Sequence, residues 1–378
     1  MSRTLELLDR LIAFPTVSHT SNLDLIDWAH GLLRDAGFAV TPIPSADGSK
    51  AGLHARIGPE GPGGICLSGH TDVVPTDGQH WTRDPFTLTG TDTHVFGRGT
   101  TDMKGFLAST LALAERAGNQ PLNAPLSLVL SYDEEVGCVG IQHMLPALAP
   151  LLGQPRLVVV GEPTSMQVAT GHKGKAAFDV TCHGQAGHSA LAPAFVNAIH
   201  VAADFVQRIR ALQDRVACAA KDDAYSIPYS TLHVGQIRGG RALNIVPDQV
   251  TLAMEARHLA ETPLQDIKTE IQAIADQVSI GYPDVPPLTV EQITAYPGLE
   301  TDAAGDAVCL AQALAGSAKT TKVPFGTEAG FFAELGLDTV VVGPGDMSTD
   351  GHKPDEGLRK TELSACDAMM DRVLQALC

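Results

Sequence analysis

Four short, strongly apolar runs constrain the fold of this chain more than any other feature of its sequence. Each run suits a buried strand, and each leads into a histidine or a carboxylate. The runs and the residues that follow them are 65–67 before His70, 126–131 before Asp133–Glu135, 157–161 before Glu162, and 339–343, through a turn-rich segment, before His352. Ligand sites gather at the carboxyl ends of strands in open α/β sheets. We therefore expect an α/β fold in which these polar residues form one cluster at one edge of a sheet.

The length of the chain and a change of pattern near residue 173 predict two domains. At 378 residues the chain exceeds the size at which a single hydrophobic core usually stops growing. After residue 173 the predicted elements follow the order β-α-β-β-α, with strands at 177–183, 231–238 and 250–257 and helices at 196–212 and 263–278. This order is typical of an α+β sandwich. We expect residues 1–172 and 290–378 to form one domain, into which residues 173–289 are inserted.

Periodicity also places the remaining elements of the first domain. Apolar residues recur at helical spacing in 4–36, as two helices, in 106–116 and in 361–377. Two further strands are predicted at 38–43 and 53–57. Residues 76–96 are polar and rich in turn-forming residues, so we expect a loop over the edge of the sheet.

Charge and cysteine content exclude several classes of function. The formal net charge of −17 argues against nucleic acid or an anionic membrane as a partner, because both attract basic surfaces. Seven scattered cysteines without a CxxC pair are typical of reduced thiols in a cytosolic protein. The first ten residues lack the apolar core of a signal peptide, and no apolar run approaches the ~18 residues of a membrane span. We expect a cytoplasmic protein.

Two imidazoles and three carboxylates are the candidate metal ligands: His70, Asp102, Glu135, Glu162 and His352. Several carboxylates buried at one strand edge are strongly unfavourable unless a cation compensates their charge. This set suits two divalent ions about 3.5–4 Å apart, with one carboxylate bridging them. Imidazole ligands favour zinc or another late transition metal over magnesium or calcium. Such a pair of ions would activate a water molecule and polarise a carbonyl group.

Each of these residues also has an ordinary structural interpretation. A histidine near a core strand is often a hydrogen-bonded core residue, and Asp133–Glu135 is typical of a solvated turn. Asp102 lies close to the N-terminus of a predicted helix, which is also the pattern of an N-cap. The glycine-rich stretch 97–105 lacks the GxxxxGK[ST] pattern, so a phosphate-binding loop is disfavoured.

Two more carboxylates fit supporting roles. Asp72, two residues after His70, is placed to accept the other imidazole N–H and fix its tautomer. Glu134 is placed to take a proton from the attacking water and pass it to a leaving amine. Because neighbours in a strand point to opposite faces, Glu134 and Glu135 divide naturally into one base and one ligand.

At this point the sequence resembles the M20 family of co-catalytic zinc amidohydrolases and peptidases over essentially its whole length. The matching stretches are 69–75, 97–105, 133–137 and 161–164. The resemblance implies a zinc-peptidase-like catalytic domain, with a mixed central sheet flanked by helices, and two bound divalent ions, with zinc favoured and cobalt as an alternative. It implies the five ligands named above, with Asp102 bridging and a cis peptide after it. It also implies Asp72 as the residue that orients His70 and Glu134 as the general base.

The resemblance further implies that the inserted domain forms a homodimer and closes over the site. Residues 187–190 match a family motif in which His188 reaches the site of the other subunit to stabilise the oxyanion. Arg257 and Asn244 resemble contacts to the substrate, and a guanidinium group suits a carboxylate. The ordinary alternatives are a turn histidine for His188 and surface positions for the other two.

Two stretches, 325–330 and 351–356, resemble the branch of the family that hydrolyses N2-acetyl-L-ornithine to L-ornithine and acetate in arginine biosynthesis. The competing branch, which desuccinylates N-succinyl-diaminopimelate, usually carries a GTSDGR-type stretch where this chain has residues 326–330. Gly330 and Lys353 depart from the proline and glutamine common in the first branch, which leaves other N-acyl amino acids open as substrates. Glu328 is a candidate source of negative potential for a cationic substrate side chain, or simply a residue at a helix start.

A non-catalytic scaffold that has kept the fold is the alternative of a different class. It predicts that a metal ligand or Glu134 is missing, and none is. The expected partners are therefore a small N-acyl amino acid and a second copy of the chain.

Overall fold

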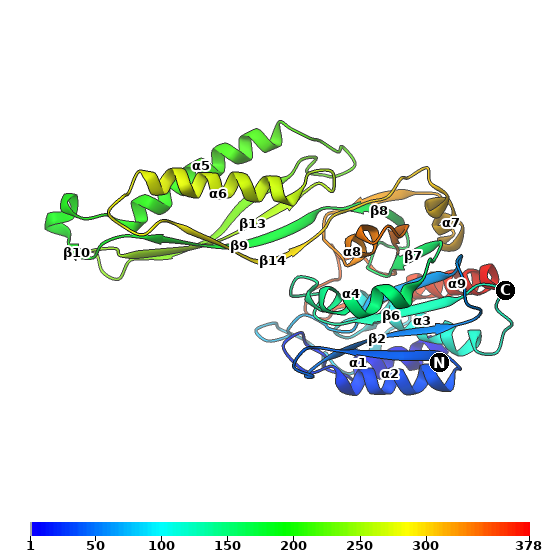
Figure 1. Ribbon diagram of the computed structural model, residues 1–378. Helices are drawn as coiled ribbons and strands as arrows, with labels where there is room; N and C mark the ends of the chain where they lie inside the picture. Colours follow the sequence, from blue (N-terminus) through cyan, green and yellow to red (C-terminus); the bar gives the residue numbers. More distant parts are fainter. Residues whose placement is uncertain (1) are drawn as a thin grey trace. The chain divides into compact units, whose positions relative to one another are not determined.

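The computed structural model describes residues 2–378, which form two compact units (Figure 1). One unit holds the chain up to Gly171 together with Leu299–Val323 and Thr327–Cys378, and the other holds His172–Gly298 and Pro324–Gly326. Each unit has its own hydrophobic core. The second unit is inserted in the sequence of the first.

The first unit is built on a mixed sheet with the strand order β1-β2-β6-β3-β7-β17-β8-β15, and β16 pairs with β8. Its strands are β1 (Ala39–Pro44), β2 (Ala51–Ile57), β3 (Ile65–His70), β6 (Leu126–Ser131), β7 (Leu157–Val160), β8 (Val168–His172), β15 (Leu299–Glu300), β16 (Thr320–Val323) and β17 (Thr339–Val341). The four apolar runs of the sequence are β3, β6, β7 and β17. These four are neighbours, and each pair among them is parallel. Their carboxyl ends therefore share one edge, as predicted.

Helices cover both faces of this sheet, which is why its central strands are buried along their whole length. The helices are α1 (Arg3–Ile12), α2 (Leu23–Asp35), α3 (Gly105–Ala117), α4 (Val139–Leu152), α7 (Asp306–Ala315), α8 (Ala329–Glu334) and α9 (Lys360–Leu377). Figure 1 shows α4 on the opposite side of β2 and β6 from α1 and α2. Helix α3 packs against α1, α9 and β3, so its side chains are buried nearly all round. The α/β prediction is confirmed.

The loop expected at residues 76–96 ends in strands. β4 (Thr89–Gly90) and β5 (His94–Phe96) form a small sheet with β18 (Gly357–Arg359), far along the chain. Strands of two or three residues leave no periodic pattern, so the sequence did not reveal them. The pairing of β5 with β18 brings the segment that carries Asp102 beside the segment that follows His352.

The second unit is an antiparallel sheet, β11-β13-β9-β14, with two helices packed on it. Its main elements are β9 (Gly174–His183), α5 (Ala198–Ala217), β11 (Thr231–Gly239), β13 (Gln249–His258), α6 (Leu264–Ile280) and β14 (Thr289–Tyr296). Alternate residues of β9 face the helices and are buried, as the sequence pattern predicted. Strand β14 was not predicted. Because it pairs with β9, the unit extends to Gly298, beyond the boundary expected at 289.

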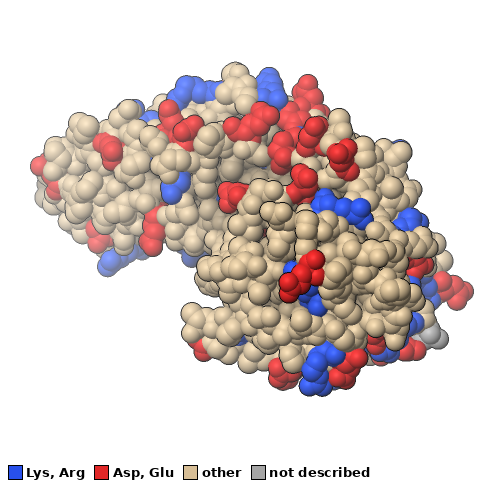
Figure 2. Space-filling model, turned by 45° about the vertical axis from the view of Figure 1, so that its right-hand side comes forward, with Lys and Arg blue, Asp and Glu red and all other residues tan. Residues whose placement is uncertain are grey.

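Three features bear on the classes of function that charge and cysteine content were expected to exclude. Within residues 2–378 no helix combines the length and apolar character needed to cross a bilayer. The face shown in Figure 2 carries acidic side chains interspersed with basic ones, which fits the net charge of −17. The seven cysteines are free, and four of them (Cys66, Cys138, Cys182 and Cys366) are buried.

Candidate metal centre and active site

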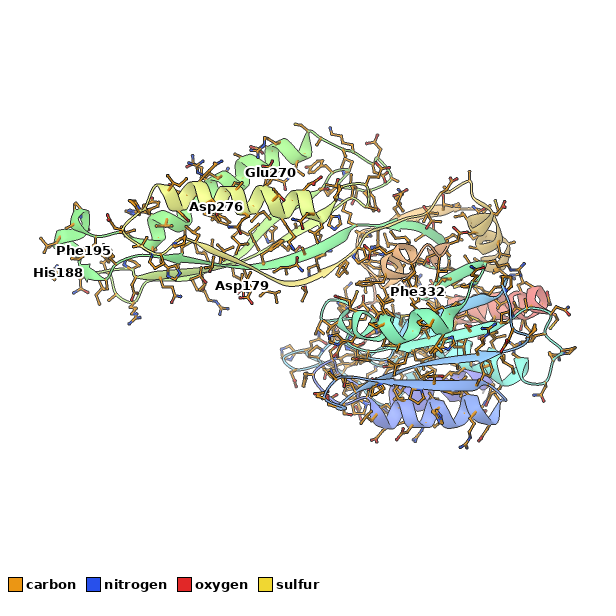
Figure 3. All side chains as sticks on the ribbon, viewed as in Figure 1. Asp179, His188, Phe195, Glu270, Asp276 and Phe332 are labelled. Atoms are coloured by element: carbon orange, nitrogen blue, oxygen red, sulfur yellow. The ribbon has the colours of Figure 1, made fainter. Side chains whose placement is uncertain are left out.

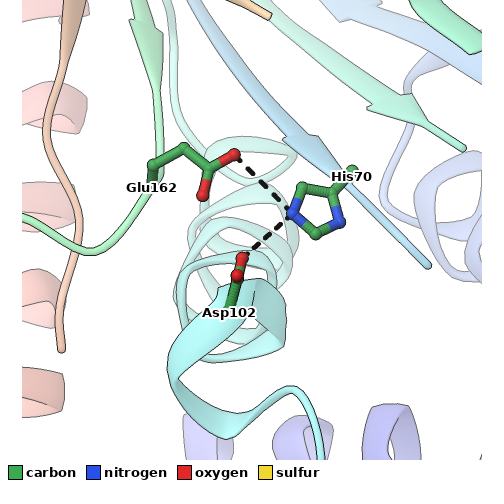
Figure 4. Close-up of side chains that lie close together, drawn as sticks. All are labelled: His70, Asp102 and Glu162. Carbon is green, nitrogen blue, oxygen red and sulfur yellow. Dashed lines mark hydrogen bonds and ion pairs between the residues drawn. The ribbon is translucent and has the colours of Figure 1, made fainter. Parts of the chain in front are cut away.

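His70, the last residue of β3, is the centre of the first candidate ligand group. Its ring is buried, and Nδ1 lies 2.9 Å from the carbonyl oxygen of Asp72. A proton on Nδ1 would be donated to that oxygen, which leaves Nε2 as the free nitrogen. Nε2 lies 3.1 Å from Oδ1 of Asp102 and 3.6 Å from Oε1 of Glu162 (Figure 4). An imidazole lone pair facing two buried carboxylate oxygens needs a proton or a cation between them.

His352 is the centre of the second group. Its Nε2 lies 3.1 Å from Oδ2 of Asp102 and 3.0 Å from Oε2 of Glu135. In each group the three ligand atoms lie within 4.8 Å of one another. Asp102 thus turns one carboxylate oxygen toward each group, which is the geometry that a bridging ligand requires.

The backbone around Asp102 is irregular. Asp102 lies in the single turn η1 (Thr100–Lys104) with φ −121° and ψ 95°, and the peptide bond that follows it is cis. The cis bond is the feature that the resemblance implied. Helix α3 begins only at Gly105, and Lys104 occupies its N-cap position. The alternative of Asp102 as an N-cap is therefore wrong.

Burial, followed by the charges of neighbouring ligands, dominates the electrostatics of the cluster. Burial and the nearby charge of Asp102 raise the pKa of Glu135 to about 7 and that of Glu162 well above its ordinary value. Hydrogen bonds to Asp102 and Glu135 raise the pKa of His352 to about 10. Burial acts in the opposite direction at Asp102, but its bonds to both imidazoles hold the pKa of that carboxyl below its usual range. The clustered carboxylates create a negative potential at the two ligand groups, so these residues fit divalent cations.

Asp72 connects the end of β3 to the turn after β6. Its carboxylate accepts the backbone N–H groups of Glu134 at 3.1 Å and Glu135 at 3.3 Å, and the Ser18 hydroxyl at 2.7 Å. Its Oδ1 lies 3.5 Å from Nδ1 of His70, farther than its own carbonyl oxygen. The tautomer of His70 is therefore set mainly by the backbone of Asp72, while the Asp72 side chain holds the Glu134 turn.

Glu134 lies beside the ligand groups. Burial, together with the negative charges of Glu135 and Asp102, raises its pKa well above the ordinary value for a glutamate. The thiol of Cys138 donates to Oε1 of Glu134 at 3.3 Å. A solvated turn, the alternative considered for Asp133–Glu135, would not make these contacts.

Glu328 lies in the first unit, at the N-cap of α8, and is buried. Its Oε2 accepts the hydroxyl of Ser131 at 2.8 Å, and its Oε1 has no partner within residues 2–378. Burial raises its pKa to about 7. Ser131 ends β6 directly beside His70, so Glu328 belongs to the same sheet edge as the ligand groups.

Three predicted site residues lie in the second unit. His188 is exposed at one end of that unit (Figure 3), at the start of the turn η2 (Ser189–Ala194). Strands β10 (Gly187–His188) and β12 (Ile245–Val246) pair there, and the Asn244 carbonyl accepts the Ser189 N–H, so Asn244 is near His188. Arg257 is half-buried on β13, and its Nε donates to Oε1 of Glu255 at 3.0 Å.

Residues 66–376 match the family described as Peptidase family M20/M25/M40. The chain belongs to this family. The acetylornithine deacetylase of Shigella sonnei (strain Ss046) is 35% identical to this M20 chain over 383 residues, covering 99% of the chain and 97% of the relative. The M20 chain is accordingly an enzyme of the metallo-peptidase and amidohydrolase class.

Solved structures of the M20 family share the fold over the whole chain. An M20 family metallo-carboxypeptidase from Sulfolobus solfataricus superposes with a TM-score of 0.79 at 19% identity, covering 100% of this chain and 99% of that one. A dinuclear metal-binding M20 peptidase from Bacillus subtilis superposes with a TM-score of 0.72 at 14% identity, covering 99% and 98%. At these identities the likeness concerns the fold.

Sequence reasoning missed one conspicuous buried carboxylate near the ligand groups. Glu356 is 1% exposed and forms an ion pair with Arg98 at 2.7 Å. It lies in the 351–356 stretch that was singled out for its resemblance, but no pattern of spacing connects it to Asp102.

Proposed function

We propose that this protein is a metal-dependent deacylase that hydrolyses N2-acetyl-L-ornithine to L-ornithine and acetate. The observation that carries the hydrolytic chemistry is the position of Asp102, whose two oxygens face two separate histidine–glutamate pairs. The choice of substrate is supported by the 35% identity to an acetylornithine deacetylase across nearly the whole chain. A place in arginine biosynthesis, in the cytoplasm, belongs to the same proposal.

Two divalent ions, zinc or alternatively cobalt, would be held by the two ligand groups. One set is His70, Asp102 and Glu162, and the other is Asp102, Glu135 and His352. Imidazole nitrogen and carboxylate oxygen are the donors that zinc takes in catalytic sites. When bound, such ions acidify the attacking water and polarise the amide carbonyl.

Glu134 acts as the general base. It lies next to the ligand Glu135, and its raised pKa brings it closer to the range in which a carboxylate accepts a proton efficiently near neutral pH. After receiving the proton from water, Glu134 returns it to the nitrogen of the leaving amine. The hydrogen bond from Cys138 and the bond that the Glu134 backbone N–H donates to Asp72 restrict where the Glu134 carboxylate can lie.

The second unit would supply dimerisation and substrate contacts. Strand β11 lies at the edge of its sheet and is largely exposed, with Ile237 57% exposed, so it suits a second copy of the chain. In such a homodimer His188 would stabilise the oxyanion in the site of the other subunit, with Asn244 nearby. Arg257 would contact the substrate carboxylate, and Glu328 would attract the cationic side chain.

The test compares two substrates in one assay. Zinc- or cobalt-loaded protein is offered N2-acetyl-L-ornithine and N-succinyl-diaminopimelate, with Glu134→Ala as the inactive variant and the exposed Glu60→Ala as its matched control. We expect preference for the acetyl substrate, abolished only by Glu134→Ala. Preference for the succinyl substrate would keep the mechanism and replace the substrate assignment. Turnover by neither would reject both substrates.

A further inference from the structure

Glu356 is a buried carboxylate for which the mechanism above has no role. Oε1 accepts the backbone N–H groups of Thr101 at 2.9 Å and Asp102 at 3.0 Å. Oε2 accepts the N–H of Gly99 at 3.0 Å and Nη1 of Arg98 at 2.7 Å. Each oxygen therefore receives two hydrogen bonds, and all four donors come from the segment that carries Asp102.

Glu356 itself belongs to the segment that carries His352. Arg98 holds the same segment at a second point, because its Nη1 also lies 3.3 Å from the Lys353 carbonyl. Its Nη2 donates to Oε1 of Gln79 at 2.6 Å, and Nε2 of Gln79 donates to the His352 carbonyl at 3.0 Å. The His352 carbonyl and the backbone that follows it are thus attached to the Asp102 segment.

His352 depends on such attachment more than the other ligands do. Its side chain is 45% exposed, whereas those of His70, Asp102 and Glu162 are 1–3% exposed. Its φ of 58° lies in the left-handed region, which a non-glycine residue adopts only when its surroundings enforce it. His70 and Glu162, by contrast, lie at or just after the ends of the neighbouring strands β3 and β7, where the sheet fixes them.

We propose that Glu356 is a positioning residue that fixes the separation of Asp102 and His352 and thereby selectively supports the ion held by Asp102, Glu135 and His352. This inference rests on the proposed two-ion centre. The ion held by His70, Asp102 and Glu162 depends much less on Glu356, because the sheet supplies two of its three ligands. Loss of Glu356 should therefore affect the two ions unequally.

The alternative is a buried ion pair that contributes to folding alone, and metal titration distinguishes the two. Glu356→Gln keeps the shape but turns an amide NH2 toward the Arg98 and Gly99 donors. Metal-stripped wild type and variant are titrated with zinc by calorimetry, and cobalt absorption spectra are recorded. The matched control is Asp367→Asn, because Asp367 on α9 also accepts two partly buried hydrogen bonds, from Thr4 and Ser109. His70→Ala and His352→Ala identify which ion is lost.

For the wild type we expect two ions per chain. In Glu356→Gln the affinity of one ion should fall about 10- to 100-fold, the range found when residues that support metal ligands are replaced. The other ion and both ions of Asp367→Asn should be little affected, and the Glu356→Gln spectrum should match that of His352→Ala rather than His70→Ala. A folded Glu356→Gln with two wild-type affinities, or with both weakened equally, overturns the inference. A wild type that does not bind two ions overturns the two-ion centre as well.

A second variant covers the case in which Glu356→Gln does not fold. Gln79 is half-buried, and Gln79→Ala removes its bond to the His352 carbonyl and the bonds that Arg98 and Trp81 donate to it, while the ion pair of Glu356 with Arg98 stays in place. We expect the same ion to be weakened about fivefold, the effect of losing the one hydrogen bond that Gln79 donates to His352. Unchanged affinities for both ions in this folded variant would contradict the proposed attachment of His352.

Discussion

The carboxylate of Asp72 accepts a hydrogen bond of 3.1 Å from the backbone N–H of Glu134. The residue two positions after His70 thus holds the turn that carries the proposed base. Replacing Asp72 with asparagine turns an amide NH2 toward N–H and O–H donors, so the turn should lose its fixed position. We expect kcat/KM of Asp72→Asn to fall about 10- to 100-fold, the range for residues that support a metal site.

The matched control for Asp72→Asn is Ser18→Ala, which removes a single hydrogen bond to the same carboxylate. Its effect on kcat/KM should be smaller, about fivefold at most, because one net hydrogen bond contributes about 1 kcal/mol. Equal effects of the two variants would show that Asp72 does not hold the Glu134 turn.

His54, a buried residue of β2, should make the first unit sensitive to acid. Burial, reinforced by the charge of Arg56, lowers its pKa from the model-peptide value of 6.5 to about 4. The unfolded chain therefore binds a proton that the folded chain does not, and the free energy of unfolding falls as pH decreases from about 6.5 to 4. This difference in the pKa of His54 between the unfolded and folded chain corresponds to about 3 kcal/mol in the free energy of unfolding.

Urea unfolding at pH 7 and pH 4.5, with a chelator present, measures this dependence. His54→Leu should lose less stability than wild type over that interval, whereas the exposed His19→Leu should behave like wild type. The same loss in wild type and His54→Leu would assign the acid sensitivity to other groups.

The sheet edge was predictable because its strands are long, apolar and parallel. His70 and Ser131 are in register as the last residues of β3 and β6, so polar residues after apolar runs had to meet at one edge. The ends of most long helices and strands also fell within a few residues of their predicted positions. Local periodicity carries that information.

What the sequence could not reveal depends on contacts between distant segments. Glu356 meets Asp102 because β5 pairs with β18 across some 260 residues, and three-residue strands have no recognisable period. Asn244 comes near His188 through strands of two residues, and the family resemblance alone suggested a connection. Edge strand β14 escaped prediction although it closes the second sheet.

Glu328 should determine preference for a cationic side chain. It is a buried carboxylate at the same sheet edge, and its Oε1 has no partner within the described residues 2–378. Its negative potential should favour the δ-ammonium group of acetylornithine. Glu328→Gln should therefore raise KM for that substrate about tenfold. KM for N-acetyl-norvaline, which lacks the ammonium group, should change little and serves as the control. If Glu328→Gln leaves KM for acetylornithine unchanged, Glu328 does not recognise the cationic side chain.

Action of His188 across a dimer can be tested by mixing two inactive variants. In a mixed dimer of His188→Ala and Glu134→Ala subunits, the subunit that keeps Glu134 receives an intact His188 from the other. Because half of randomly formed dimers are mixed and each has one working site, about a quarter of wild-type activity should return. Each variant alone should stay nearly inactive. If the mixture is no more active than its components, although mixed dimers are seen by native mass spectrometry, His188 does not act across the dimer.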